Sequence, residues 1–343
     1  MSPGMQRLFD TSGAFAHPVT LITVGVASAG ILAGLVSVPF ISKGMKDPET
    51  AREVRTRTIT WVVIAPLVLG PVIAAPLGAI LIAAALSLLC YREFARVTGL
   101  FRERLVSALV VLGILAMSFS HIDHWKGLSV AIQAITLSTL CVFSVFPDRP
   151  KGYIQRVALG TAAFLLFGVG LLRLGAMAND DRYRALICAV ILSTQLSDVF
   201  GFCAGKIARK VIPGEPTRLF PTTSPGKTLA GHLGALLLTA PLAAYLYWLT
   251  FRGSPLDHPA HLAVMALLTA IGAQMGDLVM SSVKRDVGVK DMGALLPGHG
   301  GVLDRCNSLL FVAPVIYHYA VFFGGYATTT PVRVLTGTLL PAP

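Results

Sequence analysis

Charged residues are scarce in this chain of 343 residues, because Asp, Glu, Lys and Arg together make up only 13% of it. Soluble domains contain about 25% charged residues, so the chain has about half of the usual charge. This shortage excludes an ordinary cytosolic enzyme and a disordered protein. Regular alternation of polar and apolar residues is also missing, which excludes a transmembrane β-barrel.

Cysteine is rare as well. The five cysteines are scattered, and they form neither a CxxC pair nor a Cys/His spacing typical of metal ligands. This pattern excludes a disulfide-stapled secreted module and gives no reason to expect a zinc site.

Long hydrophobic runs make up most of the chain, which is 54% hydrophobic with a mean hydropathy of +0.71. At about 20 residues per crossing, these runs predict an all-α polytopic membrane protein with about ten transmembrane helices. Residues 59–91 are interpreted as two short helices, because they are too long for one crossing and contain three prolines. The expected spans are 17–42, 59–74, 76–91, 105–121, 127–146, 157–174, 185–202, 229–250, 260–283 and 308–326.

The basic residues are concentrated in alternate inter-span segments. One set of segments carries 21 of the 28 Lys and Arg residues, and the opposite set, which includes both termini, carries seven. Because basic residues concentrate in cytoplasmic loops, the first set is predicted to be cytoplasmic and both termini non-cytoplasmic. This distribution explains the net charge of +11 without a nucleic-acid partner. The basic segments are 43–58, 92–104, 147–156, 203–228 and 284–307.

The stretch 276–308 combines acids, bases and glycines. Asp277 lies in or near the end of an apolar span, where a carboxylate is costly without a partner and therefore indicates function. Asp277, Ser281 and Lys284 are spaced i, i+4, i+7, which places them on one face of a helix. After them come Arg285, Lys290, Asp291, Pro297, Gly298, His299, Gly300, Gly301, Asp304 and Arg305.

These residue types are typical of a phosphate and metal site. Two carboxylates, Asp277 and Asp304, can hold Mg²⁺, which prefers oxygen ligands and substrate phosphates. The basic side chains can neutralise phosphate oxygens, and the glycines let backbone N–H groups approach an anion closely. The residues alone leave one alternative open, a positively charged cytoplasmic loop with ordinary charges at its helix ends.

A second polar cluster lies within residues 195–228. Its segment SPGKT at 224–228 looks like a P-loop, but the GxxxxGK[ST] spacing is missing and no strand precedes it, so a Walker site is excluded. Hydroxyl groups and amides just before a helix still suit phosphate binding. The alternatives are a helix-end or pore-lining acid for Asp198 and contact with lipid headgroups for Lys206. The cluster contains Gln195, Ser197, Asp198, Lys206, Arg209, Lys210, Ser224, Lys227 and Thr228.

Several other polar and aromatic residues are given no catalytic role. One group at a span end is interpreted as an interfacial anchor. A second group lies on the non-cytoplasmic side and is assigned no role, and two further histidines are interpreted as packing or interface residues. The anchor is Tyr91, Glu93 and Arg96, the second group is His121, His124 and Trp125, and the further histidines are His232 and His318.

Together, the two clusters resemble the signature of the phosphatidate cytidylyltransferases, or CDP-diacylglycerol synthases. That signature runs S-x-hydrophobic-K-R-x₄-K-D and then P-G-H-G-G-hydrophobic-x-D-R-x-D, with an acid, G-K and S-P-x-K-T upstream. The chain matches it at Asp198, Gly205, Lys206, Ser224, Pro225, Gly226, Lys227, Thr228, Ser281, Val283, Lys284, Arg285, Lys290, Asp291, Pro297, Gly298, His299, Gly300, Gly301, Val302, Asp304 and Arg305. The resemblance covers roughly 55–330, which leaves an N-terminal extension at 1–54 with one extra transmembrane helix and a C-terminal tail at 331–343.

The resemblance implies the reaction of CTP with phosphatidate to give CDP-diacylglycerol and pyrophosphate. The expected cofactor is Mg²⁺, and a second cation is left open. The lipid phosphate would attack CTP directly, so no protein nucleophile is expected. Asp277 and Asp304 would bind the metal. The expected catalytic residues are Asp277, Asp304, Lys284, Arg285, Lys290, Asp291, His299 and Arg305. The expected substrate-binding residues are Asp198, Lys206, Ser224, Lys227, Thr228, Ser281, Gly298, Gly300, Gly301 and Asn307.

The loop charges and the family type together indicate that the protein lies in a bacterial inner membrane, surrounded by membrane lipids. A homodimer is left open.

Three positions depart from the family pattern. The last signature Asp is Asn307, an expected Glu or Gln is Ala230, and an expected acid is Met280. Loss of negative charge near a dication weakens metal binding or alters its coordination. These departures suggest a divergent paralogue with a shifted lipid or nucleotide preference.

Three alternatives to phosphatidate activation remain open. The first is CDP-activation or CTP-dependent phosphorylation of another membrane lipid. The second is an ion-coupled transporter that uses Asp198 and Asp277 as intramembrane acids. The third is an inactive family member with a structural role, which the amide at Asn307 suggests. Against the transporter, no inverted repeat is visible and the polar clusters lie at the ends of the spans.

Overall fold

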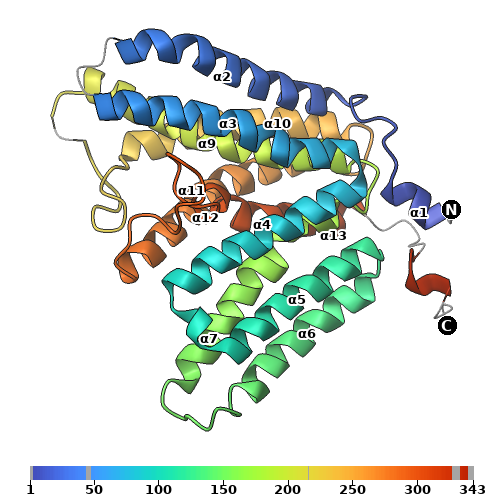
Figure 1. Cartoon of the computed structure of the whole chain (residues 1–343). Helices are drawn as coiled ribbons and strands as arrows, with labels where there is room; N and C mark the ends of the chain where they lie inside the picture. Colours follow the sequence, from blue (N-terminus) through green and yellow to red (C-terminus); the bar gives the residue numbers. More distant parts are fainter. Residues whose placement is uncertain (1–2, 44–47, 215, 327–332, 339–343) are drawn as a thin grey trace.

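The computed structural model describes residues 3–43, 48–214, 216–326 and 333–338, and these residues form an all-α bundle (Figure 1). Within these ranges the only β-type pairing is an isolated bridge between Leu296 and Gly300. The helices are α1 (Pro3–Leu8), α2 (Pro18–Lys43), α3 (Pro48–Ala74), α4 (Pro76–Val97), α5 (Arg104–Ile122), α6 (Lys126–Phe143), α7 (Tyr153–Ala163), α8 (Arg173–Met177), α9 (Tyr183–Val211), α10 (Leu229–Phe251), α11 (Pro259–Asp286), α12 (Leu303–Cys306) and α13 (Leu309–Gly324).

The predicted polytopic membrane fold is confirmed. Among the described residues, nine helical segments are long and apolar enough to cross a membrane. The tenth expected span corresponds to α13, an apolar helix of 16 residues. One of the nine, Tyr153–Met177, consists of α7, a π-helical stretch at Phe164–Leu171 and α8.

The region 59–91 forms two helices, as expected. The chain is extended at Ala75, and Pro76 opens α4, where its missing N–H would be unpaired anyway. Both helices are longer than expected, because α3 begins at Pro48 and α4 continues to Val97. The charged first turns of α3 therefore extend the helix beyond its apolar part. Residues 1–2 and 44–47 of the expected N-terminal extension 1–54, and residues 331–332 and 339–343 of the expected C-terminal tail 331–343, lie outside the described residues.

Helices α9 and α10 pack closely along one side of the bundle (Figure 1). A Cβ atom at Gly234 would lie 2.1 Å from Ala204 Cβ, and one at Gly231 would lie 2.9 Å from the carbonyl oxygen of Gly201. Small residues at such contacts allow helix backbones to approach closely within a membrane. This packing fixes the segment before α10 beside the polar end of α9.

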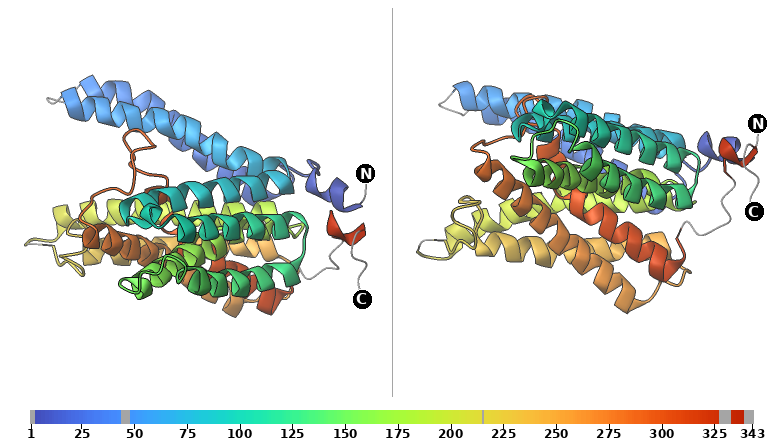
Figure 2. Two further views of the ribbon diagram at one scale, coloured as in Figure 1. Left: turned by 60° about the horizontal axis from the view of Figure 1, so that its bottom comes forward. Right: turned by 90° about the horizontal axis from the view of Figure 1, so that it is seen from below.

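The two ends of the bundle differ in their loops. The segments at 212–228 and 287–302 lie at one end, and the termini lie at the other (Figure 2). The segment 287–302 leaves the end of α11 and reaches α3, which lies on the far side of the bundle (Figure 2). It therefore closes over the polar ends of several helices.

Candidate active site

Asp277 lies at the centre of one group of polar side chains. Lys227, which directly precedes the N-cap of α10, forms an ion pair with Asp277 Oδ2. The side-chain amide of Asn307 donates a hydrogen bond of 2.6 Å to Asp277 Oδ1. Asp198 on α9 lies within electrostatic range of Asp277, Lys227 and Arg305. The structure therefore joins both sequence clusters in one site formed by α9, α10 and α11.

Asp304 lies at the centre of another group of polar side chains, and its own side chain is only 4% exposed. Lys284 Nζ lies 2.9 Å from Asp304 Oδ1. The backbone N–H groups of Met292 and Gly301 donate to Asp304 Oδ2 at 2.9 Å and 3.0 Å. Each oxygen of this carboxylate therefore has protein donors, so it ties the loop 287–302 to the end of α11.

Glu93 on α4 supports the same loop from inside the bundle. The backbone N–H groups of Val302 and Leu303 donate to its Oε1 and Oε2 at 3.0 Å and 2.8 Å. These N–H groups lie at the start of α12, so the carboxylate accepts hydrogen bonds from donors that have no partner within the helix. The interpretation of Glu93 as an interfacial anchor is wrong, because the residue is 5% exposed and faces the loop.

Two positions beside the Glu93 carboxylate have room only for glycine. A Cβ atom at Gly293 would lie 2.5 Å from Glu93 Oε1, and one at Gly301 would lie 2.3 Å from Oε2. Any larger residue would push the loop away from the carboxylate. Gly298 and Gly300 have φ angles of +74° and +80°, which side chains other than glycine rarely adopt.

Helix α3 holds the outer side of the PGHGG turn. Arg57 Nε donates to the carbonyl oxygen of Gly298 at 2.8 Å, and Thr60 Oγ1 donates to that of Pro297 at 2.9 Å. The ring of Trp61 packs edge-on against His299, with centroids 5.7 Å apart. His299 is buried, and burial lowers the pKa of its imidazole, helped by the nearby charges of Arg305 and Arg57. We therefore assign His299 a neutral ring.

The segment 212–228 joins the site through backbone contacts. Arg285 Nε donates to the carbonyl oxygen of Thr223 at 3.3 Å, and Arg209 donates to that of Gly226 at 3.2 Å. Thr228 caps α10, since its hydroxyl accepts the Gly231 N–H at 3.1 Å. The SPGKT segment is thus held between α9, α10 and the end of α11.

The remaining predicted residues lie around the groups centred on Asp277 and Asp304. A Cβ atom at Gly300 would lie 3.0 Å from Asp304 and 3.3 Å from Asp291, so both acids border this turn. Lys206 is exposed, with its ammonium group 5.7 Å from the ring centroid of Phe202. The exposed members are Asp198, Lys206, Arg285, Lys290, Asp291 and Gly298; the half-buried members are Ser224, Lys227, Asp277, Lys284, Gly300 and Arg305; the buried members are Thr228, Ser281, His299, Gly301, Asp304 and Asn307.

The residues that sequence reasoning missed lie on α3 and α4. Glu93 carries the one usable signal, because a carboxylate at the end of an apolar helix needs a partner. Arg57, Thr60 and Trp61 carry no such signal, since their contacts involve residues more than 200 positions away.

Comparison with known proteins agrees with this arrangement. Residues 55–323 match the cytidylyltransferase family, which is most of the chain and includes both polar clusters. The chain belongs to the cytidylyltransferase family. By this membership it is a nucleotidyltransferase enzyme, and its transmembrane helices make it an integral membrane protein.

Individual relatives of this cytidylyltransferase are bacterial. A phosphatidate cytidylyltransferase of Staphylococcus aureus (strain COL) is 30% identical over 269 residues, which cover 76% of this chain and 97% of that protein. One of Bacillus subtilis (strain 168) is 29% identical over 287 residues, covering 79% and 99%. An Escherichia coli (strain K12) protein described as uncharacterized protein YnbB is 38% identical over 174 residues. That match covers 49% of this chain and 51% of the relative.

Proposed function

We propose that this enzyme transfers the cytidylyl group of CTP to phosphatidate, giving CDP-diacylglycerol and pyrophosphate for phospholipid biosynthesis. The observation that carries the proposal is the cluster of Asp198, Lys227, Asp277 and Asn307 beside the Lys284–Asp304 pair. Such a set of acids and bases suits polyphosphate binding. Phosphatidate is the proposed lipid substrate because two bacterial relatives, matched over nearly their whole length, are named phosphatidate cytidylyltransferases.

The proposed reaction is a displacement at the α-phosphorus of CTP. An oxygen of the lipid phosphate forms the new P–O bond, and the bond to the β-phosphate breaks to release pyrophosphate. The attacking oxygen already carries negative charge, so the protein has no proton to remove. The task of the chain is to hold two anions close together and to stabilise the charge that develops on the leaving group.

Basic side chains from three segments would perform this task. Lys227 and Arg285 lie on the side of the SPGKT segment, and Lys284 lies on the side of Asp304. Lys227 is 31% exposed, so its ammonium group can turn from Asp277 to a phosphate oxygen. Lys290 is exposed and would add charge at the water-facing side.

The acids near Lys227 fit Mg²⁺. Asp277 and Asp198 offer hard oxygen donors, as this ion prefers. Among the described residues, no group of three or more His, Cys, Asp or Glu could hold a metal alone. Mg²⁺ is commonly held by one or two carboxylates together with substrate phosphates, so two acids are enough. When bound, the ion would neutralise phosphate charge and stabilise the leaving pyrophosphate.

Asp304 is a weaker metal ligand in this geometry. Its oxygens already accept three hydrogen bonds, and Lys284 would have to leave Oδ1 before a metal could bind there. We propose that Asp304 positions Lys284 and the loop 287–302. Direct metal binding by Asp304 stays a prediction.

The proposed setting is a bacterial inner membrane. The segments rich in Lys and Arg lie at the end of the bundle that carries the site, which by the positive-inside rule would face the cytoplasm. Both termini would then be non-cytoplasmic. The lipid tails would stay in the bilayer while CTP enters from water.

Turnover of CTP by the purified full-length protein tests the proposal. The Asp277→Asn variant is expected to lose at least about 100-fold in kcat/KM with phosphatidate and Mg²⁺. Asp286→Asn is the matched control, because it makes the same change at an exposed position on the same helix. Equal activity of wild type and Asp277→Asn would contradict the proposed site. Activity with another phospho-lipid alone would replace phosphatidate as the substrate.

A further inference from the structure

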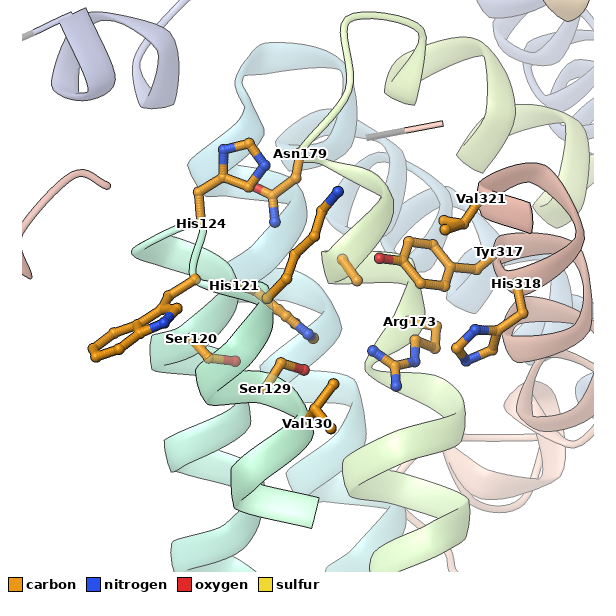
Figure 3. Close-up of a pocket in the computed structure, with 13 residues that line it drawn as sticks. Ser120, His121, His124, Ser129, Val130, Arg173, Asn179, Tyr317, His318 and Val321 are labelled. Carbon is orange, nitrogen blue, oxygen red and sulfur yellow. The ribbon is translucent and has the colours of Figure 1, made fainter. Parts of the chain in front are cut away.

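A cavity of about 160 Å³ lies at the end of the bundle opposite the candidate active site. Residues of α5, α6, α8 and α13, and of the turns next to them, line it (Figure 3). Its basic and aromatic lining includes His121, His124, Lys126, Arg173, Tyr317 and His318, and no acidic residue lines it. A lining with positive groups and no acid suits an anion.

Arg173 gives the clearest sign of a missing ligand. The residue is 6% exposed, and its Nε atom has no hydrogen-bond partner. Its guanidinium group lies 5.2 Å from the ring centroid of Tyr317. Within the described residues, no carboxylate lies within ion-pair distance of it. A buried charge without a counter-charge is costly, so a bound anion would relieve this site.

Two histidines add unsatisfied groups to the same cavity. His121 and His124 are each 4% exposed. Both ring nitrogens of His121 and the Nε2 atom of His124 have no hydrogen-bond partner. In Figure 3 the side chains of His121, Arg173 and Tyr317 point into the space between the helices. These groups supply several donors to the cavity lining, which suits phosphate recognition.

Asp123, which is next to the lining residue His124 in the sequence, already accepts hydrogen bonds from other residues. Asp123 lies in the turn between α5 and α6, where the backbone N–H groups of Leu335 and Thr336 donate to its Oδ1 at 2.6 Å and 3.1 Å. Asp180 interacts with Lys126 but does not line the cavity. Among the described residues, Arg173 therefore has no carboxylate partner inside the cavity.

We propose that this cavity binds a phosphate group, carried either by a free phosphate or by an anionic lipid headgroup. The volume is about ten times what one water molecule requires, which leaves room for a phosphate and part of its substituent. Val130 and Val321 line the cavity on α6 and α13, and Val130 is 68% exposed on the outer surface. This edge suits lipid. The site does not depend on the CTP reaction, because it lies at the other end of the bundle.

Trp125 lines the cavity and provides a local reporter. The test uses the full-length protein with Trp61→Phe and Trp248→Phe, so that Trp125 is the remaining tryptophan. Sodium phosphate is titrated against sodium chloride of equal ionic strength. In a second arm, nanodiscs of phosphatidylcholine are compared with nanodiscs that contain phosphatidylglycerol. Phosphate binding at the candidate active site would leave this fluorescence unchanged.

The variants are Arg173→Gln and Lys126→Gln, and Lys126→Gln keeps the test valid if the first does not fold. Arg252→Gln is the matched control, since Arg252 is an exposed arginine outside the cavity. We expect a saturable change in Trp125 emission that weakens at least tenfold in both cavity variants and persists in Arg252→Gln.

A response to phosphate supports a free phosphate as ligand. A response to phosphatidylglycerol alone supports a lipid headgroup. The absence of both responses, or equal responses in wild type and the cavity variants, would overturn the proposal.

Discussion

The side-chain amide of Asn307 donates a 2.6 Å hydrogen bond to Asp277 Oδ1, while Lys227 pairs with Oδ2 of the same carboxylate. Both oxygens of Asp277 thus have partners, one of them an amide where the family signature has an acid. The carboxylate is held in position, and the local negative charge is lower than the family pattern would give.

Replacing Asn307 by Asp tests the effect of this amide. The Asn307→Asp variant would place a second carboxylate against Asp277, which raises the attraction for a dication and repels Asp277 when no dication is present. We expect activity to reach half-maximum at a lower Mg²⁺ concentration. We also expect thermal unfolding at a lower temperature in the absence of Mg²⁺. Asn307→Ala serves as the uncharged comparison, and the same Mg²⁺ dependence in both variants would contradict this explanation.

Removing the charge of Glu93 should loosen the site loop. A glutamine keeps one acceptor and brings an NH₂ group against a backbone N–H, so one donor of Val302 or Leu303 loses its partner. A buried donor without a partner costs about 1–3 kcal/mol. Glu93→Gln should therefore lower both the unfolding temperature and CTP turnover, and hydrogen exchange should rise in 293–303.

The control for this change is Glu103→Gln, because Glu103 is more exposed and its ion pair with Arg156 is long, at 3.9 Å. If the backbone amides of residues 293–303 exchange as slowly in Glu93→Gln as in wild type, the conclusion that Glu93 supports the loop is wrong.

A methyl group at Gly301 should have a similar effect for a steric reason. The added Cβ would lie 2.3 Å from Glu93 Oε2, so the loop or the carboxylate must shift. Overpacking of this kind costs about 1–3 kcal/mol. Gly301→Ala should reduce activity strongly, and its unfolding temperature should fall. Gly30→Ala is the matched control, since a Cβ there meets no atom within 4 Å, and a comparable loss in that variant would contradict the explanation.

The contact from α3 should matter less. Arg57 is exposed, so loss of its hydrogen bond to Gly298 is expected to cost about 1 kcal/mol or less, or roughly a fivefold drop in turnover. Arg57→Ala is compared with Arg55→Ala, which removes another exposed arginine from the same turn of α3. Equal activity of the two variants would show that α3 does not position the PGHGG turn.

The spans could be predicted from the sequence because hydrophobic runs are continuous and local. The helices α5 and α10 each match their expected bounds to within one residue. The charge distribution also places the segments 203–228 and 284–307 at one membrane face, although it does not predict the ion pair between Lys227 and Asp277. These features depend on hydropathy and on charge distribution, which the sequence displays directly.

The supporting contacts could not be predicted in this way. The bonds from Glu93 to the start of α12 join positions more than 200 residues apart, and only the packing of α4 beneath the loop creates them. The basic cavity was missed for the same reason. His121 and His318 look like isolated histidines in the sequence, and the fold brings both to Arg173.

The position of the label transferred from CTP tests the central claim most directly. Purified protein is given phosphatidate and Mg²⁺ with CTP labelled at either the α- or the γ-phosphate, and the lipid product is analysed. Cytidylyl transfer predicts that the α-label enters the lipid, that the γ-label leaves as pyrophosphate, and that Asp277→Asn loses the transfer. Entry of the γ-label into the lipid would indicate a CTP-dependent kinase and would contradict the proposed reaction.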